Sequence, residues 1–466
     1  MQIYGVSSFT LPAPPALQLR FPAMRILTLL LFTILICSPV QAQQKKTRDQ
    51  KVREDRDKVT AAGFWIYNDL DTGFRTARQT GKPLLVVLRC IPCEECVKLD
   101  DELVDQDPVL RPLLEQFVCV RVVSTNGLDL SLFQFDTDQS FAVFMLNADR
   151  TIYGRFGTRS HRTEWIGDVS LRGLAVALQG ALRLHEMYPQ VRQSLVGKTG
   201  PQPQQARPEL LPALREKYTD QLNYSGDVVK SCIHCHQIGD AVRDGYRAAG
   251  QAIPEEVLNP YPHPRSLGLL LNPDEAATVR QVNPGSLAES AGFRAGDQIL
   301  KLASQPLLSV ADVQWVLHQI PAGGGVAMAE VQRGSQRLQI SLSLPDGWRR
   351  LDNIAWRVSA WGLRRMAAGG LQLEPVAEAE RGREGIPAAG MSLRVSHVGQ
   401  FGPHAAAKTA GFQQGDILLS LDGRTNLLTE SDVLRYGVTE RRAGEQVSVE
   451  VLRGGQKKTL LLPQQL

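Results

Sequence analysis

The chain has 466 residues, of which 43% are apolar and 21% are charged, a globular composition long enough for about three domains. Lysine and arginine number 52 and aspartate and glutamate number 48, so the net charge is only +4. A balance this close to neutral gives no large sequence-independent attraction to phosphates. We therefore expect no nucleic-acid binding.

The first 42 residues have the pattern of a secretory signal. Met24 and Arg25 precede an apolar run at 26–37, and a small-residue cleavage signal ends at Ala42. The apolar run is far shorter than the roughly 20 residues that span a bilayer. We expect residues 1–42 to be removed, with Met24 as an alternative start. The mature chain is then periplasmic or otherwise extracytoplasmic and meets the membrane only during export.

Six cysteines remain after this segment, and they lie in two places. A long exported chain with a sizeable core needs no disulfide framework, so we expect redox or ligand groups. The cysteines are Cys90, Cys93, Cys96 and Cys119 near the start, and Cys232 and Cys235 in the middle.

Residues 60–190 alternate between helix-like and strand-like patterns, which predicts one α/β domain. The expected elements are a helix at 71–79, a buried strand at 84–88, a helix opening near Cys93, a strand at 117–123, a hairpin at 141–156 and an amphipathic helix at 171–185.

The stretch "GKPLLVVLRCIPCEECVKLDDEL" joins the buried strand to three cysteines. It resembles the thioredoxin-like fold, in which the nucleophilic cysteine opens the helix after a central strand. In that resemblance the spacing from Lys82-Pro83 points to Cys93 rather than Cys90. A thiolate at a helix N-terminus is stabilised by unpaired N–H groups and the helix dipole. We expect Cys93 to attack and Cys96, one turn later, to resolve the mixed disulfide.

Other features of this region leave alternatives open. Cys90 is an auxiliary thiol that could pair with Cys93 or bind a metal. The three cysteines could instead hold Cu(I), zinc or an iron–sulfur cluster, although no fourth ligand is evident. Thioredoxins place a cis-proline before the strand that faces the disulfide, whereas "DTDQSFAVFML" has none, and Ser140 occupies that substrate-facing position. Cys119 is expected in the core.

The middle of the chain contains a second cysteine motif. Residues 191–208 are polar and proline-rich and predict a linker, and 209–260 predict a short helical segment. Within it "CIHCH" has the C-x-x-C-H pattern of covalent c-type haem, with Cys232 and Cys235 as attachment points and His236 as an iron ligand. His263 is the candidate second ligand, and the iron could also be five-coordinate.

Two other interpretations of this motif remain open. Its cysteines could form a simple disulfide, or its histidines, His234 and His236, could serve a zinc loop.

The C-terminal half repeats itself. "AGFRAGD" at 291–297 returns as "AGFQQGD" at 410–416, an offset of 119 residues (410 − 291), so two related modules lie in tandem. Each resembles the bacterial PDZ domain, and we place these domains at 261–346 and 352–466. In the first copy "SLGLLL" supplies the amides of Leu267, Gly268 and Leu269 for a peptide's terminal carboxylate. In the second copy "GGLQLE" departs from the pattern.

The whole order resembles a bacterial family of exported thioredoxin-like/PDZ (seleno)proteins, and four stretches carry the resemblance: "RCIPCEECVKLDDELV", "TNGLDLSLFQFD", "SCIHCHQIGDA" and "GPHAAAKTAGF". Some members of that family carry selenocysteine in the first motif, which implies thiol or selenol chemistry there. Together with the C-x-x-C-H motif, this predicts a multidomain thiol redox protein with a covalent haem c, in which the PDZ domains recruit a redox partner or peptide. The alternative is a PDZ scaffold with structural or metal-binding cysteines.

Overall fold

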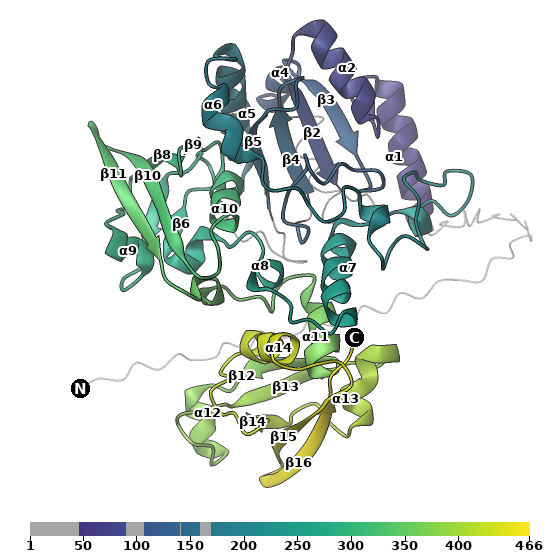
Figure 1. The fold of residues 1–466 in the computed structure, drawn as a ribbon, viewed down its shortest axis with the longest axis vertical. Coiled ribbons are helices and arrows are strands. Elements are labelled where there is room, and N and C mark those ends of the chain that lie inside the picture. Colours follow the sequence, from purple (N-terminus) through teal and green to yellow (C-terminus); the bar gives the residue numbers. More distant parts are fainter. Residues whose placement is uncertain (1–45, 90–106, 140, 159–168) are drawn as a thin grey trace, which may run out of the picture. The chain divides into compact units, whose positions relative to one another are not determined.

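The computed structural model describes residues 46–89, 107–139, 141–158 and 169–466 (Figure 1). The predicted signal, the first cysteine motif and Ser140 lie outside these residues. The described chain forms an α/β domain at 48–186, a connecting region at 192–258 and two β-rich domains at 264–344 and 360–463. Within these ranges no helix combines the length and the apolar character needed to cross a membrane.

The α/β domain has a five-stranded sheet in the order β1-β3-β2-β4-β5. Strands β1, β3 and β2 are parallel, and β4 and β5 form an antiparallel hairpin beside β2, as predicted. The elements are α1 (Arg48–Ala62), β1 (Ile66–Tyr67), α2 (Leu70–Thr80), β2 (Leu84–Arg89), α4 (Leu110–Leu114), β3 (Val118–Val122), β4 (Phe141–Leu146), β5 (Ile152–Thr158) and α5 (Leu171–Glu186).

Strand β2 is buried on both faces, which explains its continuous apolar run. Leu85 and Val87 pack in one cluster with α5, and Leu84, Val86 and Leu88 pack in another with α2. The two helices therefore cover opposite faces of the sheet (Figure 1).

The connecting region is more ordered than the predicted linker. Residues 191–208 contain α6 (Arg192–Leu195) and the short 3₁₀ helices η1 (Val196–Lys198) and η2, which begins at Pro208. Lys198 is fully buried. The Gln134 side chain accepts a hydrogen bond from Gly200 N at 2.7 Å, so the polar residues of this segment find partners in the α/β domain.

The predicted helical segment at 209–260 is helical only in its second half. Its α-helices are α7 (Cys235–Ala248) and α8 (Glu255–Leu258). The residues before α7 form turns and two short 3₁₀ helices, η2 (Pro208–Leu210) and η3 (Val229–Ser231).

The two β-rich domains have related element orders. The first contains η4 (Pro264–Leu267), β6 (Leu269–Leu271), β7 (Val279–Val282), α9 (Leu287–Ala291), β8 (Gln298–Leu302), β9 (Gln305–Pro306), α10 (Val310–His318), β10 (Gly325–Arg333) and β11 (Gln336–Leu344). After η5 (Trp348–Leu351), the second contains α11 (Ala360–Ala368), β12 (Leu371–Pro375), α12 (Glu378–Arg383), β13 (Leu393–Val398), η6 (Gly402–Ala405), α13 (Ala406–Thr409), β14 (Ile417–Leu421), α14 (Glu430–Thr439), β15 (Gln446–Arg453) and β16 (Gln456–Pro463).

The repeated Gly-Asp turn has a structural role in both domains. Asp297 is fully buried and accepts two hydrogen bonds from the Arg333 guanidinium, at 2.7 and 2.8 Å. Asp416 receives the same fork from Arg453, with both bonds at 2.6 Å. Each arginine also donates to a backbone carbonyl before the turn. A bidentate pair of this kind fixes the turn against the last hairpin, which accounts for the repeat in the sequence.

His318, at the end of α10, makes folding sensitive to acid. Its ring stacks on Tyr261 at 4.0 Å, and burial and nearby arginines lower its pKa to about 3. The unfolded chain therefore binds more protons below the ordinary pKa near 6.5, and stability falls as the pH drops from about 6.5 to about 3. We expect His318→Gln to lose less stability than wild type between pH 7 and pH 5 in urea unfolding. Exposed His397→Gln is the control, and an unchanged acid loss in His318→Gln would contradict the assignment.

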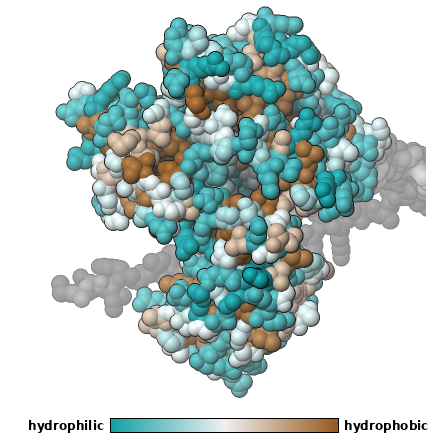
Figure 2. Space-filling model, in the orientation of Figure 1, coloured by the Kyte–Doolittle hydropathy of each residue, from teal (hydrophilic) through white to brown (hydrophobic). Residues whose placement is uncertain are grey.

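On the face shown in Figure 2, hydrophobic residues occur in small groups among hydrophilic ones. Individual apolar side chains are nevertheless open to solvent in the second β-rich domain. Phe401 is 85% exposed and Trp361 is 38% exposed.

Candidate functional site

The predicted thiol motif begins where the central strand of the α/β sheet ends. Strand β2 lies between β3 and β4, and its last residue is Arg89. The chain therefore leaves the sheet at the carboxyl end of this strand, and Cys90 is the next residue. Cys90, Cys93 and Cys96 themselves lie outside the described residues, so their pairing stays a prediction.

A buried cluster of charged side chains includes the last residue of β2. Arg89 lies 3.7 Å and Arg121 lies 3.3 Å from the Asp55 carboxylate, and both guanidinium groups are 3% exposed. Asp55 belongs to α1, so this helix is tied to the strand that leads into the motif. A cationic group close to a cysteine favours the thiolate over the thiol. The cluster places such a group directly before Cys90 in the chain.

The loop before Ser140 is held by a network that we call the arginine hub: Asp136, Asp138, Asn259, Arg349 and Arg357. The Arg357 guanidinium lies 3.3 Å from Asp136 and 3.1 Å from Asp138, with all three side chains almost fully buried. It also donates to the Asn259 side chain at 2.8 Å, and Arg349 donates to the Asn259 carbonyl at 2.9 Å.

The hub connects this loop to the start of the second β-rich domain. There the Asp138 carboxylate accepts hydrogen bonds from the amide and hydroxyl of Ser359, at 3.1 and 2.8 Å. Ser140 lies outside the described residues, but the two neighbouring segments, 136–139 and β4, are fixed in place.

The C-x-x-C-H loop is bound to the α/β domain through its backbone. The Ile233 amide donates to the Asn126 side chain at 2.8 Å, and the Ile233 carbonyl accepts from the Thr125 hydroxyl at 2.8 Å. Helix α7 begins at Cys235. Two of the sequence stretches quoted above, "TNGLDLSLFQFD" and "SCIHCHQIGDA", are therefore in direct contact.

The histidine of this loop fits haem attachment better than its two cysteines do. Asp240 lies 3.2 Å from His236 Nδ1, which leaves Nε2 as the atom that can bind a metal. Cys232 is buried, however, and Cys235 is partly buried. Cys232 Sγ donates to the Val228 carbonyl at 3.3 Å, and Cys235 packs against the core beneath α2. Burial raises the pKa of Cys232 to about 11 and that of Cys235 to about 12.

The zinc alternative gains no support from the described residues. Burial and then His236 lower the pKa of His234 to about 4, so His234 is neutral near pH 7, the form in which a histidine can bind a metal. Its ring stacks on His236, with the centroids 6.0 Å apart. In the described part of the chain, no group of three His, Cys, Asp or Glu side chains is placed to hold a metal ion.

His263 lies in the turn before the first β-rich domain. Its Nδ1 accepts hydrogen bonds from the Arg265 amide and side chain, at 3.2 and 3.1 Å, and so caps η4. These contacts give the ring a local structural role. Its assignment as a second iron ligand stays a prediction.

The loop expected to bind a peptide carboxylate is only partly open. Leu267 and Leu269 are buried, and Leu269 begins β6, which pairs with β7. The sequence predicts a free Gly268 amide. In the structure this amide instead donates to the Arg265 carbonyl at 3.0 Å. The reason is local: residues 264–267 form a 3₁₀ turn that ends with Gly268 in the left-handed conformation, at φ 81°.

The second β-rich domain contains a groove between β12, residues 353–364 and the first residue of α14. A cavity of about 510 Å³ is lined there by Gln372–Pro375 and by the start of α14, together with Trp361, Arg357 and Asp138. The groove therefore reaches the arginine hub.

One end of this groove is closed by helix α11. The Arg364 guanidinium binds the Glu430 carboxylate in a buried fork, at 2.8 and 2.6 Å, and Glu430 also accepts the Leu373 amide at 2.9 Å. The Gly370 amide donates to the Arg364 carbonyl at 2.9 Å. Both amides would otherwise be available to a docked strand or carboxylate.

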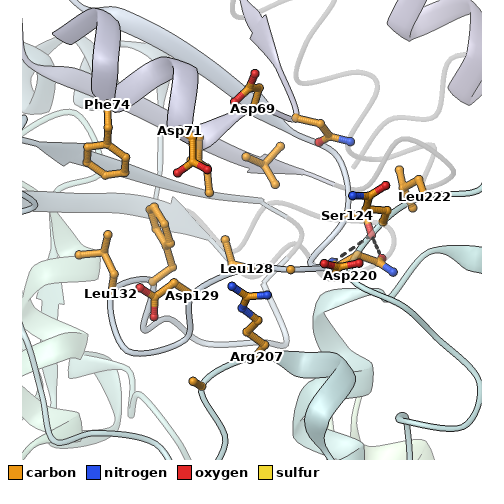
Figure 3. Close-up of a pocket in the computed structure, with 18 of the residues that line it drawn as sticks. Asp69, Asp71, Phe74, Ser124, Leu128, Asp129, Leu132, Arg207, Asp220 and Leu222 are labelled. Atoms are coloured by element: carbon orange, nitrogen blue, oxygen red, sulfur yellow. Dashed lines mark hydrogen bonds between the residues drawn. The ribbon is translucent and has the colours of Figure 1, made fainter. Parts of the chain in front are cut away.

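A larger cavity, of about 820 Å³, lies between the start of α2, the loop after β3 and residues 206–224. Figure 3 shows Arg207 entering it from the side opposite Asp69 and Asp71, with Leu128 and Leu132 between them. Cys232, Cys235 and His236 are not among its lining residues. This cavity therefore provides no haem pocket at the C-x-x-C-H motif.

Comparison with protein families accounts for three of these regions. A thioredoxin-like family model matches residues 65–148, and PDZ domain models match 278–328 and 370–463. The chain is a multidomain protein with a thioredoxin-like domain followed by two PDZ domains. We call the β-rich domains PDZ1 and PDZ2 from here on. The chain thus combines a redox-type domain with two protein-interaction modules.

Comparison with solved structures adds little. The HtrA-type protease AlgW with decapeptide matches at 19% identity and a TM-score of 0.19, over 30% of this chain and 41% of that chain. AlgW with tripeptide matches at 19% identity and a TM-score of 0.19, over 29% and 48%. The chain thus spans less than half the length of these structures. A search of curated proteins found no match.

The sequence pointed to "GGLQLE" in the PDZ2 groove but not to Arg357, Arg364 or Glu430, which also line it. Glu430 follows a helix-capping Thr429, a pattern that indicates a helix start but not a groove. Arg364 and Arg357 come from the segment before the PDZ fold, and their partners are 66 and about 220 residues away. No local signal links positions so far apart.

Proposed function

We propose that the chain is an exported thiol–disulfide oxidoreductase that docks its protein partner through PDZ2. One observation carries this proposal: the C-x-x-C motif follows directly on β2, the central strand of the thioredoxin-like sheet. Export agrees with it, because thiol–disulfide couples persist in oxidising compartments. PDZ2 is the proposed docking module, because its cavity of about 510 Å³ is lined by β12 and by residues before it, and reaches the loop before Ser140.

The proposed reaction is thiol–disulfide exchange. The Cys93 thiolate attacks one sulfur of a partner disulfide, and the partner's other sulfur leaves as a thiolate. The Cys96 thiolate then attacks the Cys93 sulfur and releases the partner as a dithiol. Two electrons have passed to the partner, and Cys93 and Cys96 are left as a disulfide. A dithiol donor restores them, and the same steps run in reverse when the partner is the donor.

The test is reduction of insulin by the full mature chain with dithiothreitol as the electron donor. We expect Cys93→Ser to abolish the catalysed rate and Cys96→Ser to accumulate a mixed disulfide, because the resolving thiol is missing. Cys119→Ala is the matched control, since Cys119 is buried in the core and should leave the rate unchanged. An undiminished rate in Cys93→Ser would refute the assignment.

The alternative is a scaffold in which the PDZ domains bind envelope proteins and the cysteines are structural. It predicts no catalysed insulin reduction in the wild-type chain. Covalent haem at Cys232 and Cys235 stays a separate prediction, and no step of the proposed reaction passes through it. The absorption spectrum of each preparation should be recorded first, because an attached haem would contribute its own Soret band.

A further inference from the structure

The edge strand of the thioredoxin-like sheet is covered by PDZ1. Strand β5 is last in the sheet order, so one side of it has no neighbouring strand and presents unpaired backbone groups. The Arg155 amide donates to the Asp312 carboxylate at 3.1 Å, and the Arg155 carbonyl accepts from the Ser309 hydroxyl at 2.6 Å. Ser309 caps α10 and Asp312 lies in its first turn, so the start of this helix takes the place of a further strand.

The contact continues around α10 with buried side chains. Lys198 Nζ lies 2.9 Å from the Asp312 carboxylate, with both side chains 0% exposed. The Trp315 indole donates to the Gly197 carbonyl at 2.8 Å, and the Arg155 guanidinium stacks 3.8 Å from the Trp315 ring. The contact therefore combines a buried ion pair, an aromatic contact and a hydrogen bond to the backbone.

Two glycines allow the domains to approach so closely. A Cβ atom added at Gly154 would lie 2.6 Å from Leu308, and one added at Gly180 would lie 2.7 Å from the same side chain. Neither glycine has a positive φ, so the backbone conformation does not require glycine there. The requirement comes from Leu308 of PDZ1.

This contact occupies the helix that a PDZ ligand would use. In PDZ2 the groove is lined by β12 and the first residue of α14, and the equivalent elements of PDZ1 are β6 and α10. The start of α10 is engaged outside PDZ1, because Ser309 and Asp312 bind the backbone of β5 and Trp315 binds the Gly197 carbonyl. We infer that PDZ1 is an intramolecular dock for the edge strand of the thioredoxin-like sheet and not a receptor for a partner's chain end. This goes beyond the proposed function, because recruitment of partners is left to PDZ2.

The experiment compares two helix glycines in the full mature chain. Gly180 in α5 faces Leu308, whereas Gly245 in α7 has open space around its Cβ position. Alanine in a helix is intrinsically more stable than glycine. We therefore expect Gly245→Ala to raise the unfolding temperature slightly and Gly180→Ala to lower it by several degrees. Adding Leu308→Ala to Gly180→Ala should restore part of the loss, because the clash is removed.

The opposite outcomes would overturn the inference. These are equal stabilisation by the two alanines, or no recovery with Leu308→Ala. A second measurement does not depend on how the variants fold: in the wild-type chain, hydrogen exchange of α10 amides should be as slow as that of β2. Fast exchange of α10, typical of an exposed helix, would also refute the interface.

Discussion

Asp312→Asn is expected to lower the free energy of unfolding by about 3–5 kcal/mol, because it leaves a buried lysine without its counter-charge. Lys198 and Asp312 are both 0% exposed and 2.9 Å apart. Asparagine keeps one acceptor oxygen, whereas the Asp312 carboxylate accepts the amides of both Arg155 and Leu308, so the loss combines the charge with one hydrogen bond. Urea unfolding of the mature chain measures it. Asp129→Asn is the control, since the Asp129 and Arg150 side chains are 36% and 58% exposed, and it should change stability little.

The pH dependence gives this prediction a second test. Burial lowers the pKa of Lys198, and Asp312 opposes that shift. Below the ordinary lysine pKa near 10.4 the unfolded chain then holds more protons than the folded chain, so stability rises with pH. Without Asp312 the rise should begin at a lower pH and be larger. A variant that loses less than about 1 kcal/mol and shows the wild-type pH profile would contradict a charged Lys198 at this interface.

Arg357→Met is expected to cost a similar amount, about 3–5 kcal/mol, because it removes the cation that neutralises two buried carboxylates. Asp136 and Asp138 lie 3.3 and 3.1 Å from the Arg357 guanidinium. Arg357→Lys should lose less, since it keeps the charge but not the planar fork that also reaches Asn259. Arg394→Met, which breaks the half-exposed pair with Glu380, is the control for a surface contact.

Lowering the pH should reduce the loss of unfolding free energy that Arg357→Met causes. Buried carboxylates without their cation have raised pKa values, so they take up protons at mild acid and their cost shrinks. Urea unfolding at pH 8 and pH 5 should therefore show a larger difference from wild type at pH 8. If the loss of unfolding free energy is the same at pH 8 and pH 5, or is larger at pH 5, the arginine acts by packing alone.

The sequence predicted those parts of the fold whose signals are local. The apolar run at 84–88 became β2, the turn residues "NADR" became the β4–β5 hairpin, and the repeated Ala-Gly-Phe turn marked both PDZ domains. Helix α1 was missed because only Val52 and Val59 are buried among its many charged residues. Its place depends on distant partners of Asp55, which no periodicity reveals.

The features of the candidate sites were also predicted only where their signal in the sequence is local. The cysteine motifs were visible because their chemistry depends on closely spaced residues. The engaged amide of Gly268 was not predicted, since it follows from a 3₁₀ turn whose residues resemble an ordinary loop. Nor could the Leu308 contact be inferred, because glycine in an amphipathic helix has the same appearance whether it faces solvent or a neighbouring domain.

The arginine hub also bears on how the chain is made. Asp136 and its partner Arg357 are 221 residues apart, so a ribosome adding about 5–20 residues per second needs on the order of 10 to 40 s to supply the second after the first. During that interval the nascent loop before Ser140 has its carboxylates but not their cation. The loop before Ser140 can therefore reach its final structure only after residue 357 has been made.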